Sequence, residues 1–158
     1  MDTILNPSGR IGPVTFRNVA LVLILIGALF SILPYFRPDM ALVSFASMLL
    51  LYPWVVIWVK RFHDAGKPGS RFLIVLVAWL VAGVAANHFL VSLFVPNPPP
   101  IDPNFVWLSM QAQMQANALP GTIVSTLLSL GFALVVNEEL KSDPSENAYG
   151  PPEGGRSP

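Results

Sequence analysis

Four long apolar stretches divide the chain, and charged residues, proline or glycine separate each stretch from the next. They cover residues 18–36, 40–59, 72–95 and 119–136. A helix needs about 20 predominantly apolar residues to cross a hydrocarbon layer about 30 Å thick, and each stretch is close to that length or longer. The fourth is the shortest and is rich in glycine, serine and threonine, which is typical of a helix held by neighbouring helices. The pattern predicts an all-α integral membrane protein with four transmembrane helices.

The segments outside these stretches are polar or interrupted by proline. We expect three regions: a cytoplasmic N-terminal segment over residues 1–17, a four-helix transmembrane domain over 18–141 and a disordered cytoplasmic tail over 142–158. The loop before the fourth stretch begins with several prolines, after which Trp107, Met110 and Met114 recur at helical spacing. Two interpretations of residues 105–118 therefore stay open, a short interfacial helix on the outer surface or a solvated linker.

The composition agrees with a membrane protein. Hydrophobic residues make up 53% of the 158 residues and charged residues only 11%, and the mean hydropathy is +0.59, which is outside the usual balance of a soluble globular domain. Basic and acidic residues number nine each, so the net charge predicts no attraction to nucleic acid. The chain has no cysteine, which excludes disulfides, thiolate metal sites and cysteine nucleophiles.

The positions of the basic residues predict the orientation. Eight of the nine lysines and arginines fall on one side of the predicted membrane, and only Arg37 falls on the other. The positive-inside rule therefore places both termini, and the loop between the second and third stretches, in the cytoplasm.

The densest cluster of charge is that loop, KRFHDAGKPGSRF, residues 60–72. His63 lies beside Asp64, and the carboxylate favours the imidazolium while the basic loop opposes it, so the imidazole could titrate near neutral pH. One histidine and one aspartate are fewer ligands than a bound zinc takes, and we predict no catalytic residue, metal or cofactor. A ligand-binding or proton-handling role stays open beside a structural one. In the structural role Asp64 accepts hydrogen bonds from Arg61, from His63 or from backbone N–H groups at the turn, and Gly66 caps the helix.

The same loop offers basic groups to lipid. Lys60, Arg61, Lys67 and Arg71 would meet anionic headgroups, which attract each basic residue by about 1 kcal/mol near the surface. The segment GKPGS is not a phosphate-binding loop, because its order differs from the Walker motif and its proline lacks an N–H donor. We therefore expect anionic lipid headgroups at the cytoplasmic face as partners.

Few polar residues lie inside the predicted helices. Asn87 and His88 lie about 7 Å from the middle of the third stretch, within the hydrocarbon. An intramembrane ionisable residue is a functional candidate, but a lone histidine makes a poor proton path. We expect both side chains to face other helices as hydrogen-bonded packing groups. Pro53 should kink the second helix.

Small residues recur every four positions on the last two stretches. They are Ala78, Ala82 and Ala86 on the third, and Ser125, Ser129 and Ala133 on the fourth. Such stripes allow helices to approach closely, so we expect these two helices to touch.

Three short motifs stand out beside the apolar pattern. They are Gly9-Arg10 before the first stretch, Lys60-Arg61-Phe62-His63-Asp64-Ala65-Gly66-Lys67 in the loop, and Asn147-Ala148-Tyr149-Gly150-Pro151 near the end. Together they resemble the pattern of the domain of unknown function 805 family. The chain departs from that pattern at Gly12-Pro13, where the family has a second basic residue, and at Ser70, where it has an aromatic residue. The resemblance implies a four-helix protein of the bacterial inner membrane and supplies no activity.

Three classes of function remain open. A non-enzymatic membrane protein that packs against itself as a homo-oligomer, or against a membrane-protein partner, needs only the stripes, the loop and the tail, and we rank it first. A small-solute or proton transporter would use His88, Asn87 and the Pro53 kink, but four helices enclose no obvious polar route. An enzyme at the membrane interface would use His63 and Asp64, and it lacks a nucleophile or a metal set.

Overall fold

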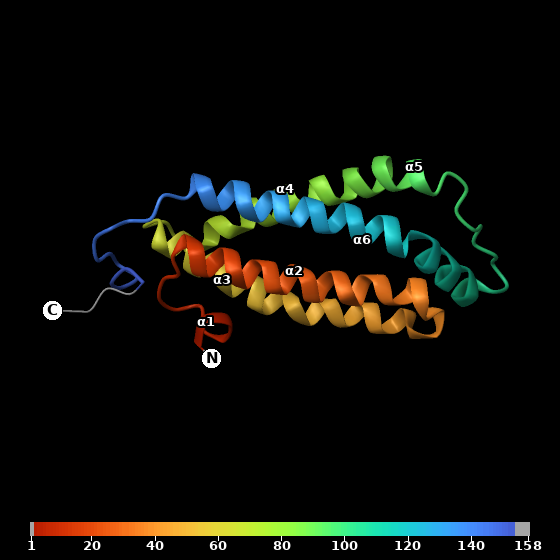
Figure 1. Ribbon diagram of the computed structural model, residues 1–158, viewed down its shortest axis with the longest axis horizontal. Helices are drawn as coiled ribbons and strands as arrows, with labels where there is room; N and C mark the ends of the chain where they lie inside the picture. Colours follow the sequence, from red (N-terminus) through yellow and green to blue (C-terminus); the bar gives the residue numbers. More distant parts are fainter. Residues whose placement is uncertain (1, 154–158) are drawn as a thin grey trace.

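The structure is a computed structural model that describes residues 2–153 as an elongated bundle of helices (Figure 1). The helical elements are α1 (Asp2–Leu5), α2 (Pro13–Phe36), η1 (Pro38–Leu50), α3 (Leu51–Asp64), η2 (Gly69–Arg71), α4 (Phe72–Ala86), η3 (Asn87–Val91), α5 (Ser92–Phe94) and α6 (Val106–Glu139). Within residues 2–153, four helical segments are long and apolar enough to cross a membrane: Pro13–Phe36, Phe45–Asp64, Gly69–Phe94 and Val106–Glu139. This confirms the prediction of an all-helical chain with four apolar helices of membrane-crossing length.

Both ends of the described chain lie at the same end of the bundle, on the left in Figure 1, together with the turn between α3 and α4. We call this the terminal end. The opposite end carries the turn between α2 and η1 and the long loop before α6. Four crossings bring the chain back to the side from which it started, so this arrangement agrees with four spans.

The helix α6 is longer than the fourth apolar stretch. Residues 106–118 form neither a separate interfacial helix nor a linker, because they are the first turns of α6, which continues through Pro120 to Glu139. Leucine, methionine, glutamine and alanine are good helix formers and dominate this segment. A proline removes one backbone hydrogen bond, and α6 continues past it. The interpretations that separated residues 105–118 from the fourth helix are therefore wrong.

The second crossing changes its winding along its length. It is a 3₁₀-helix from Pro38 to Leu50 and an α-helix from Leu51 onward. Pro53 consequently falls in the first turn of α3, where a missing N–H costs least because the first N–H groups of a helix have no partner within it. The proline thus marks a change of helix type.

The buried core is concentrated toward the terminal end. Phe16 on α2 meets Trp58 on α3 edge to face, with the ring centroids 4.6 Å apart. Ile57, Phe62 and Leu140 belong to the same buried cluster. This core fixes α2, α3 and the end of α6 around one point.

Among the four crossings, α4 contributes least to the core, since Phe72 is its one buried residue. The helix nevertheless contacts α6, because the indole N–H of Trp79 donates to Ser129 Oγ at 3.2 Å. The predicted contact between the third and fourth apolar helices therefore forms. Ala133 instead lies beside Ala20 of α2, so the stripe on α6 is divided between two neighbouring helices.

Candidate functional site

The three motifs meet at the terminal end, and each contains a glycine with positive φ. Gly9 has φ +82°, Gly66 φ +65° and Gly150 φ +110°, and these are the positive values among the described residues. Glycine adopts this left-handed region without the steric cost that a Cβ brings. Gly66 follows the end of α3 at Asp64, as predicted for a left-handed cap.

Asp64 lies at the centre of the site and is 2% exposed. Its Oδ1 accepts from Arg10 Nη2 at 3.1 Å and from Arg10 Nε at 3.3 Å. Its Oδ2 accepts from Arg61 Nη1 at 2.8 Å and from the hydroxyl of Ser142. A carboxylate offers about four lone-pair directions, so hydrogen bonds within the chain occupy all of them. The predicted Arg61–Asp64 pair forms, and Arg10 joins it from the other end of the sequence.

Arg10 connects the centre to the C-terminal segment. Its Nη1 donates to the carbonyl oxygens of Ser145 at 2.7 Å and Gly150 at 3.2 Å. Its Nη2 also donates to the carbonyl oxygens of Asp64, at 3.2 Å, and Asp143. The Arg10 side chain has no exposed surface, so its hydrogen bonds replace the water that a buried guanidinium loses.

Arg61 connects the centre to the end of α6. Its Nε donates to Asn137 Oδ1 at 2.6 Å, and its Nη2 donates to the carbonyl oxygens of Asn137 at 3.0 Å and of Leu140. Arginine at this place satisfies carbonyls that a helix C-terminus leaves without intrahelical partners. Asn137 Nδ2 then donates to Pro13 O at 3.2 Å, which ties in the start of α2. We call Arg10, Arg61, Asp64, Asn137 and Ser142 the Asp64 network.

His63 points away from Asp64. Its Nδ1 lies 3.1 Å from Gly9 O and its ring stacks on Tyr149, with centroids 3.8 Å apart and planes 3° apart. Asn147 Nδ2 donates to His63 O at 3.2 Å. A carbonyl can only accept, so Nδ1 carries the proton in this contact. The histidine thus joins the N-terminal and C-terminal motifs.

The C-terminal segment follows α6 back across the terminal end. We expected a disordered tail over residues 142–158, but residues 142–153 make defined contacts with the rest of the chain. Residues 154–158 lie outside the described residues. Asp143 N donates to Asp64 O at 2.8 Å, and Gly12 N donates to Glu153 Oε2 at 2.6 Å. The polar composition that favoured disorder instead supplies these partners.

In this segment, hydrogen bonds and a nearby positive charge change the pKa of the Asp143 carboxyl group. The hydroxyl and the N–H of Ser145, the amide of Asn147 and the charge of Arg10 all stabilise its carboxylate, and they hold the pKa of Asp143 below its ordinary value.

Two of the basic residues of the loop are buried, and the other two are more exposed. Lys60 is 6% exposed and Arg61 is 1% exposed, so neither presents its charge to lipid headgroups, which corrects that part of the expectation. Arg71 is exposed and Lys67 is half-buried. Only part of the charge in the loop therefore remains for the membrane surface. Outside the loop, Pro151, the last residue of the C-terminal motif, is also exposed.

The two intramembrane polar residues are not part of the site. Asn87 and His88 begin the π-helical turn η3, and both are exposed on the bundle surface. Asn87 Nδ2 donates back to Gly83 O at 3.0 Å, while the His88 ring lies edge-on to Phe89. The expectation that both side chains face other helices is wrong for His88.

Sequence reasoning missed Asn137, Ser142 and Asp143 as partners of the motifs. The available signal was a single amide at the end of an apolar run, in the sequence ALVVNEE, and it is weak. Ser142 and Asp143 fall in a segment whose composition is typical of disorder. No spacing along the chain relates them to residue 64.

The described residues contain no group of three or more histidine, cysteine, aspartate or glutamate side chains that could hold a metal ion. The arrangement instead pairs one carboxylate with two guanidinium groups, and the remaining guanidinium N–H groups meet carbonyl oxygens. A buried cluster of this kind is strong only when each polar atom has a partner. The cluster therefore holds four parts of the chain together through ion pairs and hydrogen bonds.

A family model described as "Protein of unknown function (DUF805)" matches residues 4–151. The chain belongs to this family. The match contains all three motifs and therefore the whole Asp64 network. No curated protein and no solved structure matches the chain.

Proposed function

We propose that this DUF805 protein is a non-enzymatic protein of the bacterial inner membrane that works by packing against another membrane protein, either a second copy or a different chain. The saturation of Asp64 carries the proposal. Both of its carboxylate oxygens accept hydrogen bonds from the chain itself, so Asp64 joins segments of the chain and its carboxylate is fully engaged in doing so. A terminal end held in one geometry suits a protein that presents a fixed surface to a partner.

The proposal places the terminal end in the cytoplasm. The eight-to-one distribution of basic residues supports this orientation. Arg17, Arg71 and Lys141 are exposed at that end, where anionic headgroups of the inner leaflet would meet them. Reporter fusions after Val95 should be active in the periplasm and fusions after Phe62 in the cytoplasm, and the reverse pattern would contradict the orientation.

Catalysis by His63 and Asp64 is less well supported. The imidazole Nδ1 is engaged with Gly9 O, and one ring face is covered by Tyr149. Asp64 accepts hydrogen bonds from two guanidinium groups, so its carboxylate oxygens already have partners within the chain. The pair shares no hydrogen bond in which one group could activate the other.

The structure gives less support to a transport function than to a packing function. His88, the ionisable residue that a proton path would use, lies exposed on η3. The cavity described below is lined by apolar and hydroxyl side chains, and His88 does not line it. A continuous polar route would therefore need residues from a second chain.

Extraction of the protein with its surrounding native lipids tests the proposal. The chain is cross-linked in its own membrane and captured in native-lipid discs, and the mass of the complex is measured by native mass spectrometry. We expect a complex of fixed stoichiometry with a second membrane protein or a second copy. The Asp64→Ala variant, expressed to the same level, should lose that complex because its terminal end is no longer held.

Two outcomes would overturn the proposal. One is a single chain with lipids alone, obtained from the unmodified protein. The other concerns His63→Asn: if this variant keeps the complex and the fold but reproduces the growth defect that deletion of the protein causes, His63 has a chemical role.

A further inference from the structure

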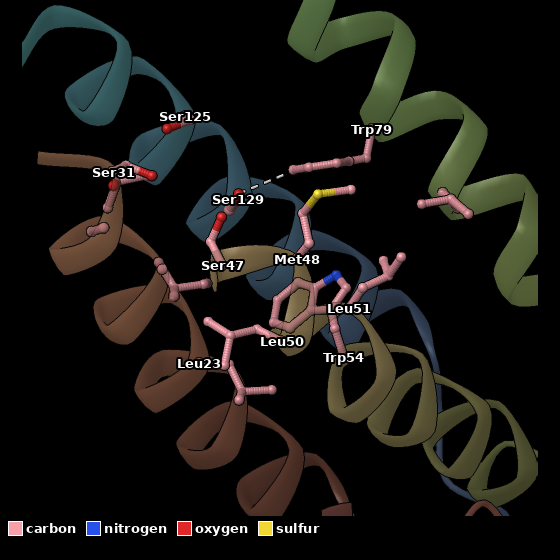
Figure 2. Close-up of a pocket in the computed structure, with 15 residues that line it drawn as sticks. Leu23, Ser31, Ser47, Met48, Leu50, Leu51, Trp54, Trp79, Ser125 and Ser129 are labelled. Carbon is pink, nitrogen blue, oxygen red and sulfur yellow. Dashed lines mark hydrogen bonds between the residues drawn. The ribbon is translucent and has the colours of Figure 1, made fainter. Parts of the chain in front are cut away.

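A cavity of about 350 Å³ lies among α2, η1, α3, α4 and α6, away from the Asp64 network (Figure 2). Its walls are mostly apolar and include the indole rings of Trp54 and Trp79. Gly27 helps to keep the space open, since a Cβ at this position would already lie 3.8 Å from Leu50 Cδ1. Ligand pockets begin at about 300 Å³, so the cavity is large enough for a small molecule.

The cavity lies far from the charged terminal end and opens to the surface of the bundle, where Met48 and Leu51 are exposed. On α2 its lining extends from Leu23 to Ser31, and on α6 from Ser129 back to Ser125. At 1.5 Å per residue from Arg17 and Asn137, these positions are about 9–21 Å from the charged terminal end. The hydrocarbon layer is about 30 Å thick, so a molecule reaches this space through the bilayer.

Hydroxyl groups interrupt the apolar lining. They belong to Ser31, Ser47, Ser125, Thr126 and Ser129. Figure 2 shows Trp79 reaching from α4 toward Ser129 on α6, with the hydrogen bond of 3.2 Å drawn between them. A hydroxyl has two lone pairs and one proton, so Ser129 can accept from Trp79 and still offer a hydrogen bond to a ligand.

None of the described residues that line the cavity is ionisable. A charged ligand would lose its hydration at this depth and gain no counter-charge, which excludes charged molecules. An engineered apolar cavity of about 150 Å³ in another protein holds one benzene, so this volume fits a molecule of about two rings. Aromatic walls favour a flat ring over a flexible chain.

We propose that the cavity binds one neutral, membrane-soluble, two-ring compound that carries at least one hydrogen-bonding oxygen. The rings lie against Trp54 and Trp79, and the oxygen meets the hydroxyl groups on α6. A saturated lipid chain has the necessary solubility but makes no use of the hydroxyls. The site is independent of the Asp64 network and of the partner proposed above.

Tryptophan fluorescence in lipid nanodiscs tests the site, with 1,4-naphthoquinone as the probe. Partition into lipid gives quenching that rises linearly with concentration, whereas a site adds a saturable component. We expect Gly27→Leu to remove the saturable component, because its side chain fills the cavity. Ser129→Ala should weaken binding about fivefold, the effect of one lost hydrogen bond.

Gly131→Leu provides the matched control, since Gly131 lies on α6 with no other side chain within 4 Å and does not line the cavity. This variant should bind as the unmodified protein does. If Gly27→Leu does not fold, Ser125→Leu fills the same space from the opposite wall.

Three results would overturn the proposal. Purely linear quenching would mean that no site exists, and equal saturable binding by Gly27→Leu would place it elsewhere. If naphthalene, which has no oxygen, binds as tightly as the probe and Ser129→Ala has no effect, the cavity accepts any apolar group, including a lipid chain.

Discussion

The same helices are held in two different ways at the terminal end and around the mid-membrane cavity. At the terminal end charged groups are buried beside the apolar core, and each hydrogen bond of Asp64 fixes both a distance and a direction. Around the cavity the side chains are mostly apolar, and an apolar side chain in a membrane meets a similar environment whether it faces lipid or a helix. Register is therefore set by the polar end, while the apolar part tolerates open space.

Two ion pairs, one at each end of the bundle, allow the effect of burial to be compared with that of charge. Arg61 and Asp64 form an ion pair at 2.8 Å with side chains 1% and 2% exposed. Arg37 and Asp39 form one at the same distance at the opposite end of the bundle, with both side chains 62% exposed. The shortest N···O distances are equal, so what distinguishes the two pairs is burial and the second guanidinium, that of Arg10, on Asp64.

The largest expected effect is that of removing the central carboxylate. Asp64→Ala leaves Arg10 and Arg61 buried without a counter-charge, which typically costs about 3–5 kcal/mol. Asp39→Ala removes an exposed partner that water and salt already screen, so it should cost far less. Thermal unfolding of both variants in the same detergent measures the contrast. If Asp64→Ala unfolded at the same temperature as Asp39→Ala, the Asp64 network would not stabilise the fold.

The next effect concerns the glycine that ends α3. At Gly66, where φ is +65°, alanine should lower the free energy of unfolding by about 1–2 kcal/mol, because a Cβ opposes the left-handed conformation. The same substitution at Gly131, which is helical and uncrowded, should raise stability slightly through helix propensity. Denaturant titration followed by circular dichroism compares the two. Equal shifts in the same direction would argue against a conformational requirement at residue 66.

A smaller effect of opposite sign is expected at the cavity. Gly27→Ala places a Cβ in ordinary contact with Leu50 and improves helix propensity, so stability should rise by up to about 1 kcal/mol. The measurement is the same denaturant titration. A clear loss of stability would mean that the space around residue 27 is tightly packed and that the apolar part is less tolerant than the comparison assumes.

The smallest expected effect is the pH dependence from Asp143. Its folded-state pKa is lowered, mainly by the Ser145 hydroxyl, so the stabilisation is present above the ordinary value of 3.8 and is lost as the pH falls through the folded-state pKa. Asp143→Asn should flatten the dependence of the melting temperature on pH in this acidic window. Melting curves of both proteins between pH 3 and pH 6 test this, and identical slopes would show that the contact to Ser145 does not stabilise the carboxylate.

The local features were predictable because they depend on neighbours in sequence. The four apolar helices follow from runs of Leu, Val and Ile, and the Arg61–Asp64 pair lies three residues apart on one helix, which is the spacing of helical neighbours. Gly66 was predictable as a cap for the same reason. His63 was one of several possible donors to its sequence neighbour Asp64, and it instead meets Gly9 and Tyr149, because neighbours on a helix point to different sides.

The amino-acid sequence by itself determined the number of apolar helices, their approximate places and the family of the chain, since length, hydropathy and short motifs carry that information. Only the tertiary structure decided that Arg10 and Ser142 both donate to Asp64 and that hydroxyls from α2, η1 and α6 surround one cavity. The physical reason is separation along the chain: a contact between residues 54 or 78 positions apart forms only when helix packing brings them together, and no local pattern records it.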